Sequence, residues 1–332
     1  MSPLEARYRR LLRLLPEPAR TRWADDMTDT FLSATTDDDP EFAEFGSPGL
    51  ADRWDVLRLA VRLRLGGPGS APRAAVTGGV LQLVALVGLL AAATGALTGL
   101  LVTAWQRGLL PFVAAPELAG PVSDGWPNAL APVLSLLTVV LVVCLVLGVH
   151  PAARLLAGGL LVGELALATT SHGSVLPWLP TIVPLVAAAL AEPARRAHPV
   201  RWLAAVPFAA TLTVGAPWLL VATGVWTPTR APTAAYLWAD PTAGQALALV
   251  AVGGWLLAHR RTAAAALLAV AVLGVVVLTQ LADRLTWTGT SAGYQASAAA
   301  VGVVLAVVLA AATVAGAREV RSLPAGEHAP AG

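Results

Sequence analysis

Residues 75–104 read AVTGGVLQLVALVGLLAAATGALTGLLVTA and contain no charged side chain. A helix needs about 20 mostly apolar residues to cross the roughly 30 Å hydrocarbon core of a bilayer, so this stretch is long enough to span one. The whole chain is 56% apolar and only 13% charged, whereas a soluble domain has about 25% charged residues. These features predict an all-α, polytopic membrane protein.

The apolar region, residues 74–317, divides into eight predicted transmembrane helices. They cover 75–104, 130–149, 155–171, 175–191, 202–224, 244–258, 263–281 and 297–316. Only Ser171–Ser174 separates the third from the fourth, so a re-entrant hairpin is the alternative to two full spans there. The two tight inner turns, at His150–Arg154 and His259–Thr262, are similar and suggest a 4+4 repeat.

Arginine is distributed unevenly between the predicted loops, and the chain has no lysine. With the amino terminus inside, eight arginines fall in inner loops and the carboxy-terminal tail, and three fall in outer loops. Cytoplasmic loops carry the excess of positive charge, so we expect a multi-pass protein of the cytoplasmic (inner) membrane with both termini in the cytosol. We expect residues 318–332 to form a disordered cytosolic tail, and we see no cleaved signal peptide.

Residues 1–73 carry 11 of the 22 arginines and predict a cytosolic domain of three amphipathic helices. The helices cover 3–15, 19–34 and 47–65. Ser2 can cap the first helix, and the acidic run 37–44 is a solvated break. The expected inner face of the third helix consists of Leu50, Trp54, Leu57, Val61 and Leu65. The segment Gly66–Ser70 is expected to be a flexible joint before the membrane.

Glu164 is the only carboxylate well inside a predicted span. An ionisable group at that depth is costly unless it is paired or hydrated. It therefore suggests a proton relay, a cation site or an ion pair, and the alternative is a protonated acid bonded to a neighbouring helix. Thr279 and Gln280 are its candidate partners in an intramembrane polar site.

The predicted amino-terminal domain is small for an independent core, which suggests that it docks on a partner or on the membrane. The candidate interface residues are Tyr8, Leu11, Leu12, Trp23, Met27, Phe31 and Trp54. The arginines of its first and third helices suggest contact with anionic lipid. The pairs Gly95/Gly99 and Gly159/Gly163 match Gly-x-x-x-Gly and predict close helix packing.

Several classes of function find no support in the residues. The single cysteine, Cys144, excludes an intrachain disulfide and a cysteine-based metal cluster. A chain without lysine has no phosphate-binding Gly-x-x-x-x-Gly-Lys loop, and a net charge of +2 does not indicate nucleic acid. We therefore predict no catalytic residues, no metal and no cofactor.

The amino-terminal pattern resembles a known kind of module. It consists of Tyr8–Pro16, Trp23–Met27 with Phe31–Leu32, and Ala51–Leu65. It is similar to a cytosolic helical module of uncharacterised actinobacterial membrane proteins, often encoded beside PadR-type regulators. The resemblance implies a regulatory or transport-associated context and supplies no catalytic residues.

Two functional hypotheses follow. The first is a non-enzymatic membrane protein with a regulatory or interaction role, which binds a protein or membrane partner through residues 1–73. The alternative is a small-solute transporter or permease subunit that uses Glu164. A lipid-modifying enzyme is a third hypothesis, but the outer loops lack the clustered acids and histidines that it needs.

Overall fold

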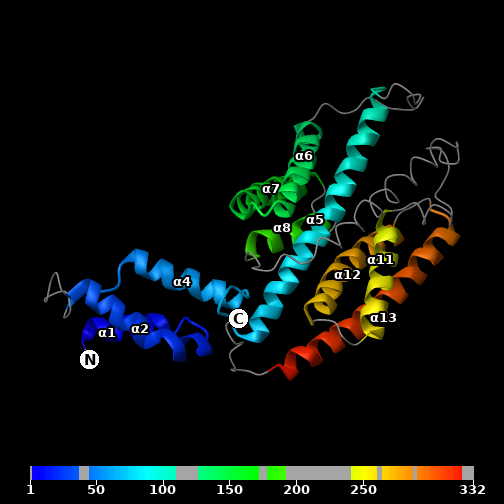
Figure 1. Ribbon diagram of the computed structural model, residues 1–332. Helices are drawn as coiled ribbons and strands as arrows, with labels where there is room; N and C mark the ends of the chain where they lie inside the picture. Colours follow the sequence, from blue (N-terminus) through cyan, green and yellow to red (C-terminus); the bar gives the residue numbers. More distant parts are fainter. Residues whose placement is uncertain are drawn as a thin grey trace. The chain divides into compact units, whose positions relative to one another are not determined.

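The computed structural model describes residues 2–36, 45–109, 126–171, 178–191, 241–259, 264–286 and 290–323 (Figure 1). These residues form ten α-helices and no strand, which confirms the all-α prediction. The chain divides into two compact units, residues 1–79 with 319–332 and residues 80–318. The acidic run 37–44 and the predicted fifth span, 202–224, lie outside the described residues.

The first unit is built from amphipathic helices around one apolar core. Its elements are α1 (Pro3–Leu12), α2 (Glu17–Thr36), α4 (Leu50–Arg64), the first turns of α5 (Pro72–Gln106) and the end of α13 (Ala292–Ser322). The Ser2 hydroxyl accepts a hydrogen bond from the Glu5 N–H at 3.1 Å, so the predicted cap of α1 is confirmed. The Tyr8 and Phe31 rings stack in the core with their centroids 4.1 Å apart.

The predicted inner face of α4 is wrong. Val56, Ala60 and Leu63 face the core and are at most 3% exposed. The predicted residues Leu50, Trp54, Leu57 and Val61 are 84%, 65%, 40% and 42% exposed. Both sets follow the helical repeat, so periodicity alone does not decide which of them packs against the rest of the unit.

The segment Gly66–Ser70 is a folded turn rather than a flexible linker. The Gly67 N–H donates to the Arg62 carbonyl oxygen at 2.8 Å. Gly66 has φ +85°, and a Cβ added there would lie 2.5 Å from the Ala74 carbonyl oxygen in the first turn of α5. The joint therefore packs backbone to backbone against the beginning of the first apolar helix.

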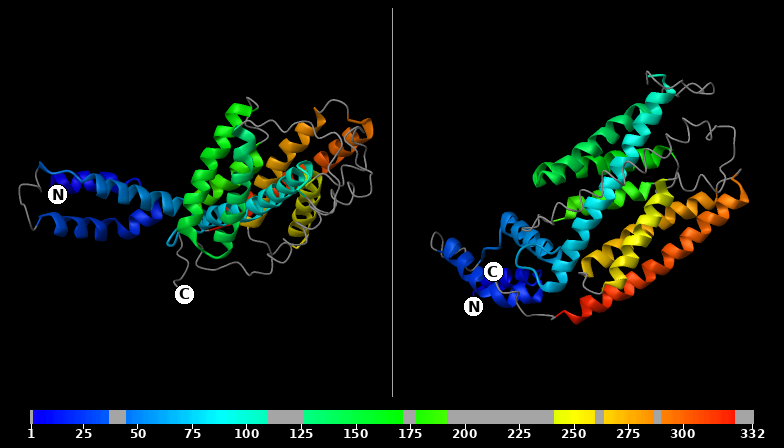
Figure 2. Two further views of the ribbon diagram at one scale, coloured as in Figure 1. Left: turned by 90° about the horizontal axis from the view of Figure 1, so that it is seen from above. Right: turned by 45° about the vertical axis from the view of Figure 1, so that its right-hand side comes forward.

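The second unit contains the apolar helices and two main cores. Its helices are the rest of α5 and α13 together with α6 (Trp126–Val146), α7 (His150–Ser171), α8 (Leu179–Leu190), α11 (Pro241–Ala258) and α12 (Ala264–Leu285). The first core joins α5, α6, α7, α8 and α12, and the second joins α11, α12 and α13, which lie side by side in Figure 2. Because α12 contributes to both cores, it is the central helix of this unit.

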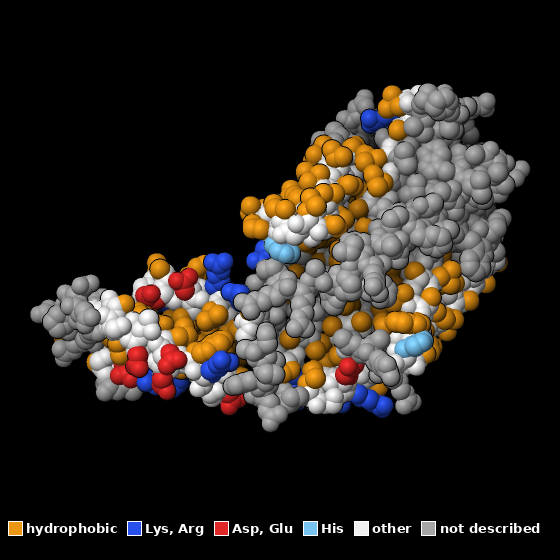
Figure 3. All heavy atoms as spheres, viewed as in Figure 1, with side chains coloured by type: hydrophobic (Ala, Val, Ile, Leu, Met, Phe, Trp, Pro, Cys, Tyr) orange, Lys and Arg blue, Asp and Glu red, His pale blue; other side chains and the backbone are white. Residues whose placement is uncertain are grey.

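Four described helices are long and apolar enough to cross a bilayer. They are Pro72–Leu97, His150–Thr169, Ala264–Leu285 and Ala292–Ser322. Shorter apolar helices lie at Pro132–Val146, Leu179–Leu190 and Thr242–Ala258, within or overlapping the predicted second, fourth and sixth spans. On the face drawn in Figure 3, hydrophobic side chains cover α6 and α7, whereas charged side chains gather on the first unit. These helices indicate a membrane-embedded protein.

Close helix packing occurs at one glycine of the predicted pairs, Gly163, and at other glycines outside them. An added Cβ at Gly95 or Gly159 would meet nothing within 4 Å. At Gly163 it would lie 2.9 Å from a methyl carbon of Leu134. At Gly88 it would overlap the Pro184 ring, and at Gly274 it would overlap the Leu309 side chain. The pair Gly159/Gly163 therefore marks a close approach of α7 to α6 at Gly163 alone, whereas Gly95 and Gly159 are open.

Candidate functional site

Glu164 lies on α7 and is 8% exposed. Apolar residues of the first core surround this part of α7, including Leu160 and Leu167. Among the described residues, none donates a hydrogen bond to the Glu164 carboxyl group. The structure thus places the Glu164 carboxyl group in a buried part of α7, within the third predicted span.

The predicted partners of Glu164 do not form a hydrogen-bonded site with it. The Thr279 hydroxyl donates to the Val276 carbonyl oxygen of its own helix at 2.7 Å. The Gln280 Oε1 atom is buried and accepts no hydrogen bond from the described residues. Their joint role with Glu164 therefore stays a prediction that no contact in the described part of the chain supports.

Arg73 is a structural residue that the sequence analysis missed. Its guanidinium donates to the Leu323 carbonyl oxygen at 3.2 and 3.3 Å and to the Arg321 carbonyl oxygen at 3.3 Å. A cation at a helix carboxy terminus satisfies the last carbonyl groups and interacts favourably with the helix dipole. The first turn of α5 is thereby held beside the end of α13. The sequence feature that could have indicated this contact is the position of Arg73, directly after Pro72 and at the start of a long apolar run.

Arg154 makes the equivalent contact in the second unit. One of its terminal nitrogens donates to the Ala191 carbonyl oxygen at 2.6 Å, directly after the last residue of α8. The first turn of α7 therefore lies beside the end of α8. With 12 residues, α8 is about 18 Å long, so it covers little more than half of a bilayer core.

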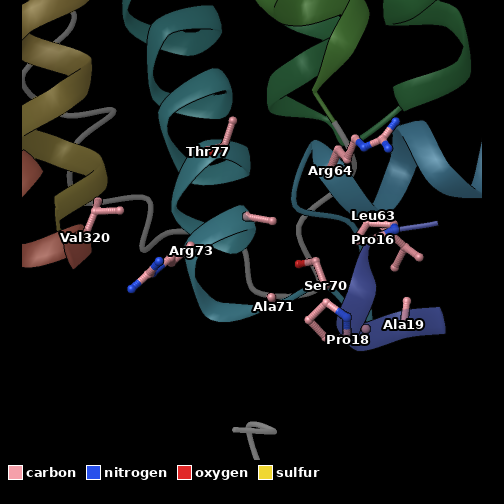
Figure 4. Close-up of a pocket in the computed structure, with 12 residues that line it drawn as sticks. Pro16, Pro18, Ala19, Leu63, Arg64, Ser70, Ala71, Arg73, Thr77 and Val320 are labelled. Atoms are coloured by element: carbon pink, nitrogen blue, oxygen red, sulfur yellow. The ribbon is translucent and has the colours of Figure 1, made fainter. Parts of the chain in front are cut away.

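A cavity with a volume of about 350 Å³ lies wholly within the first unit. Residues from α2, α4, the joint and the beginning of α5 line it, including Arg64, Ser70 and Arg73. In Figure 4 the Arg73 side chain extends toward Val320, and Arg64 points away on the other side. The Arg64 guanidinium donates to the Leu14 carbonyl oxygen at 2.8 Å. Arg64 and Arg73 thus both donate hydrogen bonds to backbone carbonyl groups, and their side chains point in different directions rather than toward one ligand.

The seven candidate interface residues of the first unit fall into two groups. Tyr8, Leu12 and Phe31 are buried in its core, and Leu11, Trp23 and Met27 pack against that core. Trp54 stands on the exposed face of α4. An interface through these residues stays a prediction, and Trp54 marks the surface of this unit that is available for one.

We call that surface the outer stripe and define it as Leu50, Trp54, Leu57 and Val61 of α4. These residues fall within an arc of about 60° on a helix of 3.6 residues per turn. The opposite side of α4 carries the buried residues Val56 and Leu63. A surface helix normally has a single apolar stripe facing the core, so a second, exposed stripe on α4 needs a separate explanation.

No metal site is evident among the described residues, because no three side chains of His, Cys, Asp or Glu lie close enough together to hold an ion. Searches of protein-family models, of curated proteins and of solved structures found no match to this chain.

Proposed function

We propose that this chain is a polytopic membrane protein whose amino-terminal unit is an interaction module at the cytosolic membrane surface. The observation that carries the proposal is the two-faced helix α4. One face completes the core of the unit, and the outer stripe leaves four apolar side chains between 40% and 84% exposed. Large exposed apolar surfaces commonly mark interaction sites. The resemblance of residues 1–73 to a cytosolic helical module implies a regulatory or transport-associated context, which is compatible with this role.

One structural contact and the arginine distribution of the sequence support the predicted topology. The Arg73 contacts hold the start of α5 beside the end of α13, so these helices begin and end at the same side if both cross the bilayer. An even number of crossings follows, as in the eight-span proposal. The arginine excess of the predicted inner loops favours the cytosol as that side.

Site-directed photo-crosslinking in living cells tests the interaction module. The photoreactive residue benzoylphenylalanine replaces Trp54 in the full-length chain, and a control variant carries it at Asp55. Both positions are exposed, but Asp55 lies off the outer stripe. We expect adducts, detected by gel shift for protein and by peptide mass for lipid, from position 54 and not from position 55. Equal or absent adducts at the two positions would show that the stripe has no partner.

A small-solute transporter is the second candidate function, and the burial of Glu164 favours it. A carboxyl group that is 8% exposed, with no hydrogen-bond donor among the described residues, is suited to exchange a proton or to bind a cation. The test uses proteoliposomes with an internal pH-sensitive dye under an imposed potential. We expect ion flux from the wild-type protein and none from Glu164→Gln. Equal flux from the two proteins would exclude Glu164 from the transport step.

A further inference from the structure

The chemistry of α4 indicates which partner its outer stripe takes. Exposed arginines border the stripe on both sides, with Arg58 along one edge and Arg53 along the other. The Arg53 Nε atom donates to the Pro48 carbonyl oxygen at 3.0 Å, and a guanidinium has four further N–H donors. The two carboxylates of the helix, Asp52 and Asp55, lie on the remaining arc. A helix with an apolar face that contains tryptophan and has arginine-rich borders is typical of segments that lie in a membrane interface.

The chain also keeps α4 close to a bilayer. Residues 65–71 separate the end of α4 at Arg64 from the start of α5 at Pro72. Seven residues span at most about 25 Å even when fully extended, and the folded turn at Gly66–Ser70 shortens this distance. Because α5 begins a candidate membrane span, a lipid surface is always within reach of the outer stripe. Such tethering raises the effective concentration of a surface without any additional contact.

We propose that the outer stripe of α4 docks on the anionic leaflet of the membrane in which the protein resides. Trp54, Leu57 and their neighbours enter the boundary between headgroups and acyl chains, and the bordering arginines bind lipid phosphates. The inference rests on the proposed interaction module and names its partner. The arginine borders favour anionic lipid over an apolar protein groove, because they match negative headgroups on both sides of the stripe.

The charged border predicts the size of the lipid dependence. A basic residue near an anionic leaflet contributes about 1 kcal/mol, which corresponds to about a fivefold change in the ratio of docked to free helix. We therefore expect Arg58→Gln to reduce docking about fivefold. A high salt concentration is expected to weaken docking as well, because it screens the contacts between arginine and phosphate.

Cysteine protection tests the inference on the full-length protein in nanodiscs that hold one copy each. The chain has one cysteine, so Cys144→Ala provides a cysteine-free background. Single cysteines then replace Leu57 or Val61 on the stripe and Asp55 off it. The rate of reaction with a water-soluble maleimide is measured in neutral phosphatidylcholine discs and in discs containing 30% phosphatidylglycerol.

We expect positions 57 and 61 to react at least tenfold more slowly than position 55 in the anionic discs. We also expect protection to fall in neutral discs and to fall about fivefold with Arg58→Gln. Equal rates at the three positions in anionic discs would overturn the inference, as would protection that is identical in both lipids and unchanged by Arg58→Gln. If position 54 crosslinks to a protein in cells while the stripe stays unprotected in discs, the interaction module stands and the lipid assignment is wrong.

Discussion

Gly66→Ala is the most informative single change, because it places a methyl group where the joint touches α5. Gly66 has φ +85°, and a non-glycine residue in a left-handed conformation costs about 1–2 kcal/mol. The new Cβ would lie 2.5 Å from the Ala74 carbonyl oxygen and 2.8 Å from the Gly78 backbone. Backbone atoms cannot move aside as the end of a side chain can, so overpacking adds about 1–3 kcal/mol.

The expected destabilisation of the joint is therefore at least about 2 kcal/mol, which corresponds to roughly a 30-fold increase in its open population. Trypsin measures this population in the full-length protein in nanodiscs, since cleavage of a transiently open segment follows the opening equilibrium. The arginines at 62, 64 and 73 flank the joint and provide the cleavage sites. We expect cleavage there to be about 30-fold faster in Gly66→Ala than in the wild-type protein.

Gly95→Ala is the matched control, because Gly95 lies on the same helix α5 and an added Cβ meets nothing within 4 Å. Replacing an open helical glycine with alanine is neutral or slightly stabilising, so its cleavage rate should match that of the wild-type protein. If Gly66→Ala and Gly95→Ala were cleaved at the same rate, the backbone contact between joint and α5 would have no role in holding the unit closed.

Three further changes test other contacts. Burial raises the pKa of Tyr8 above its ordinary value, with a smaller contribution from the charge of Asp52. We expect the tyrosinate absorbance of Tyr8, obtained by subtracting the titration of Tyr8→Phe from that of the wild-type protein, to have a midpoint above about 10. Since the folded-state pKa is the higher one, this group's stabilisation is present below the unfolded pKa and is lost as the pH rises through the folded value. Arg73→Gln removes the hydrogen bonds to the end of α13, so hydrogen exchange in the last turn of α13 should accelerate several-fold, and unchanged exchange would contradict the contact. Gly88→Ala places a Cβ on the rigid ring of Pro184, which should cost about 1–3 kcal/mol and lower the melting temperature in detergent. An unchanged melting temperature would contradict the close packing of α5 against α8 at this glycine.

Much of the fold was predictable because its causes are local. Continuous apolar composition predicted the membrane helices, and the described helices fall within or overlap the predicted segments outside 202–224. The Ser2 cap of α1 follows from a side chain and a backbone group that lie three residues apart. The sequence assigns residues 318–322 to the tail, yet these residues are helical, because α13 continues to Ser322.

The candidate site was less predictable, because its contacts join residues that are distant in the chain. The apolar run around Glu164 predicted its position inside a span, and its burial against neighbouring helices is a finding of the structure. The absence of a hydrogen bond from Thr279 or Gln280 to Glu164 depends on how α7 and α12 pack, which the residue types do not reveal. The hydrogen bonds of Arg73 cross 248 and 250 residues of sequence, and no local pattern indicates them.

The amino-acid sequence by itself determined that this protein is helical and belongs in a bilayer, because hydrophobicity and backbone hydrogen bonding act over one or a few helical turns. It also predicted one apolar stripe on α4, at Leu50, Trp54, Leu57, Val61 and Leu65. Only the tertiary structure showed that a second apolar stripe, Val56, Ala60 and Leu63, is the buried one. Trp54 and its neighbours on the predicted stripe are exposed. The physical reason is that both stripes have the same spacing, so the choice between them depends on how α1 and α2 pack against α4 and not on the helix alone.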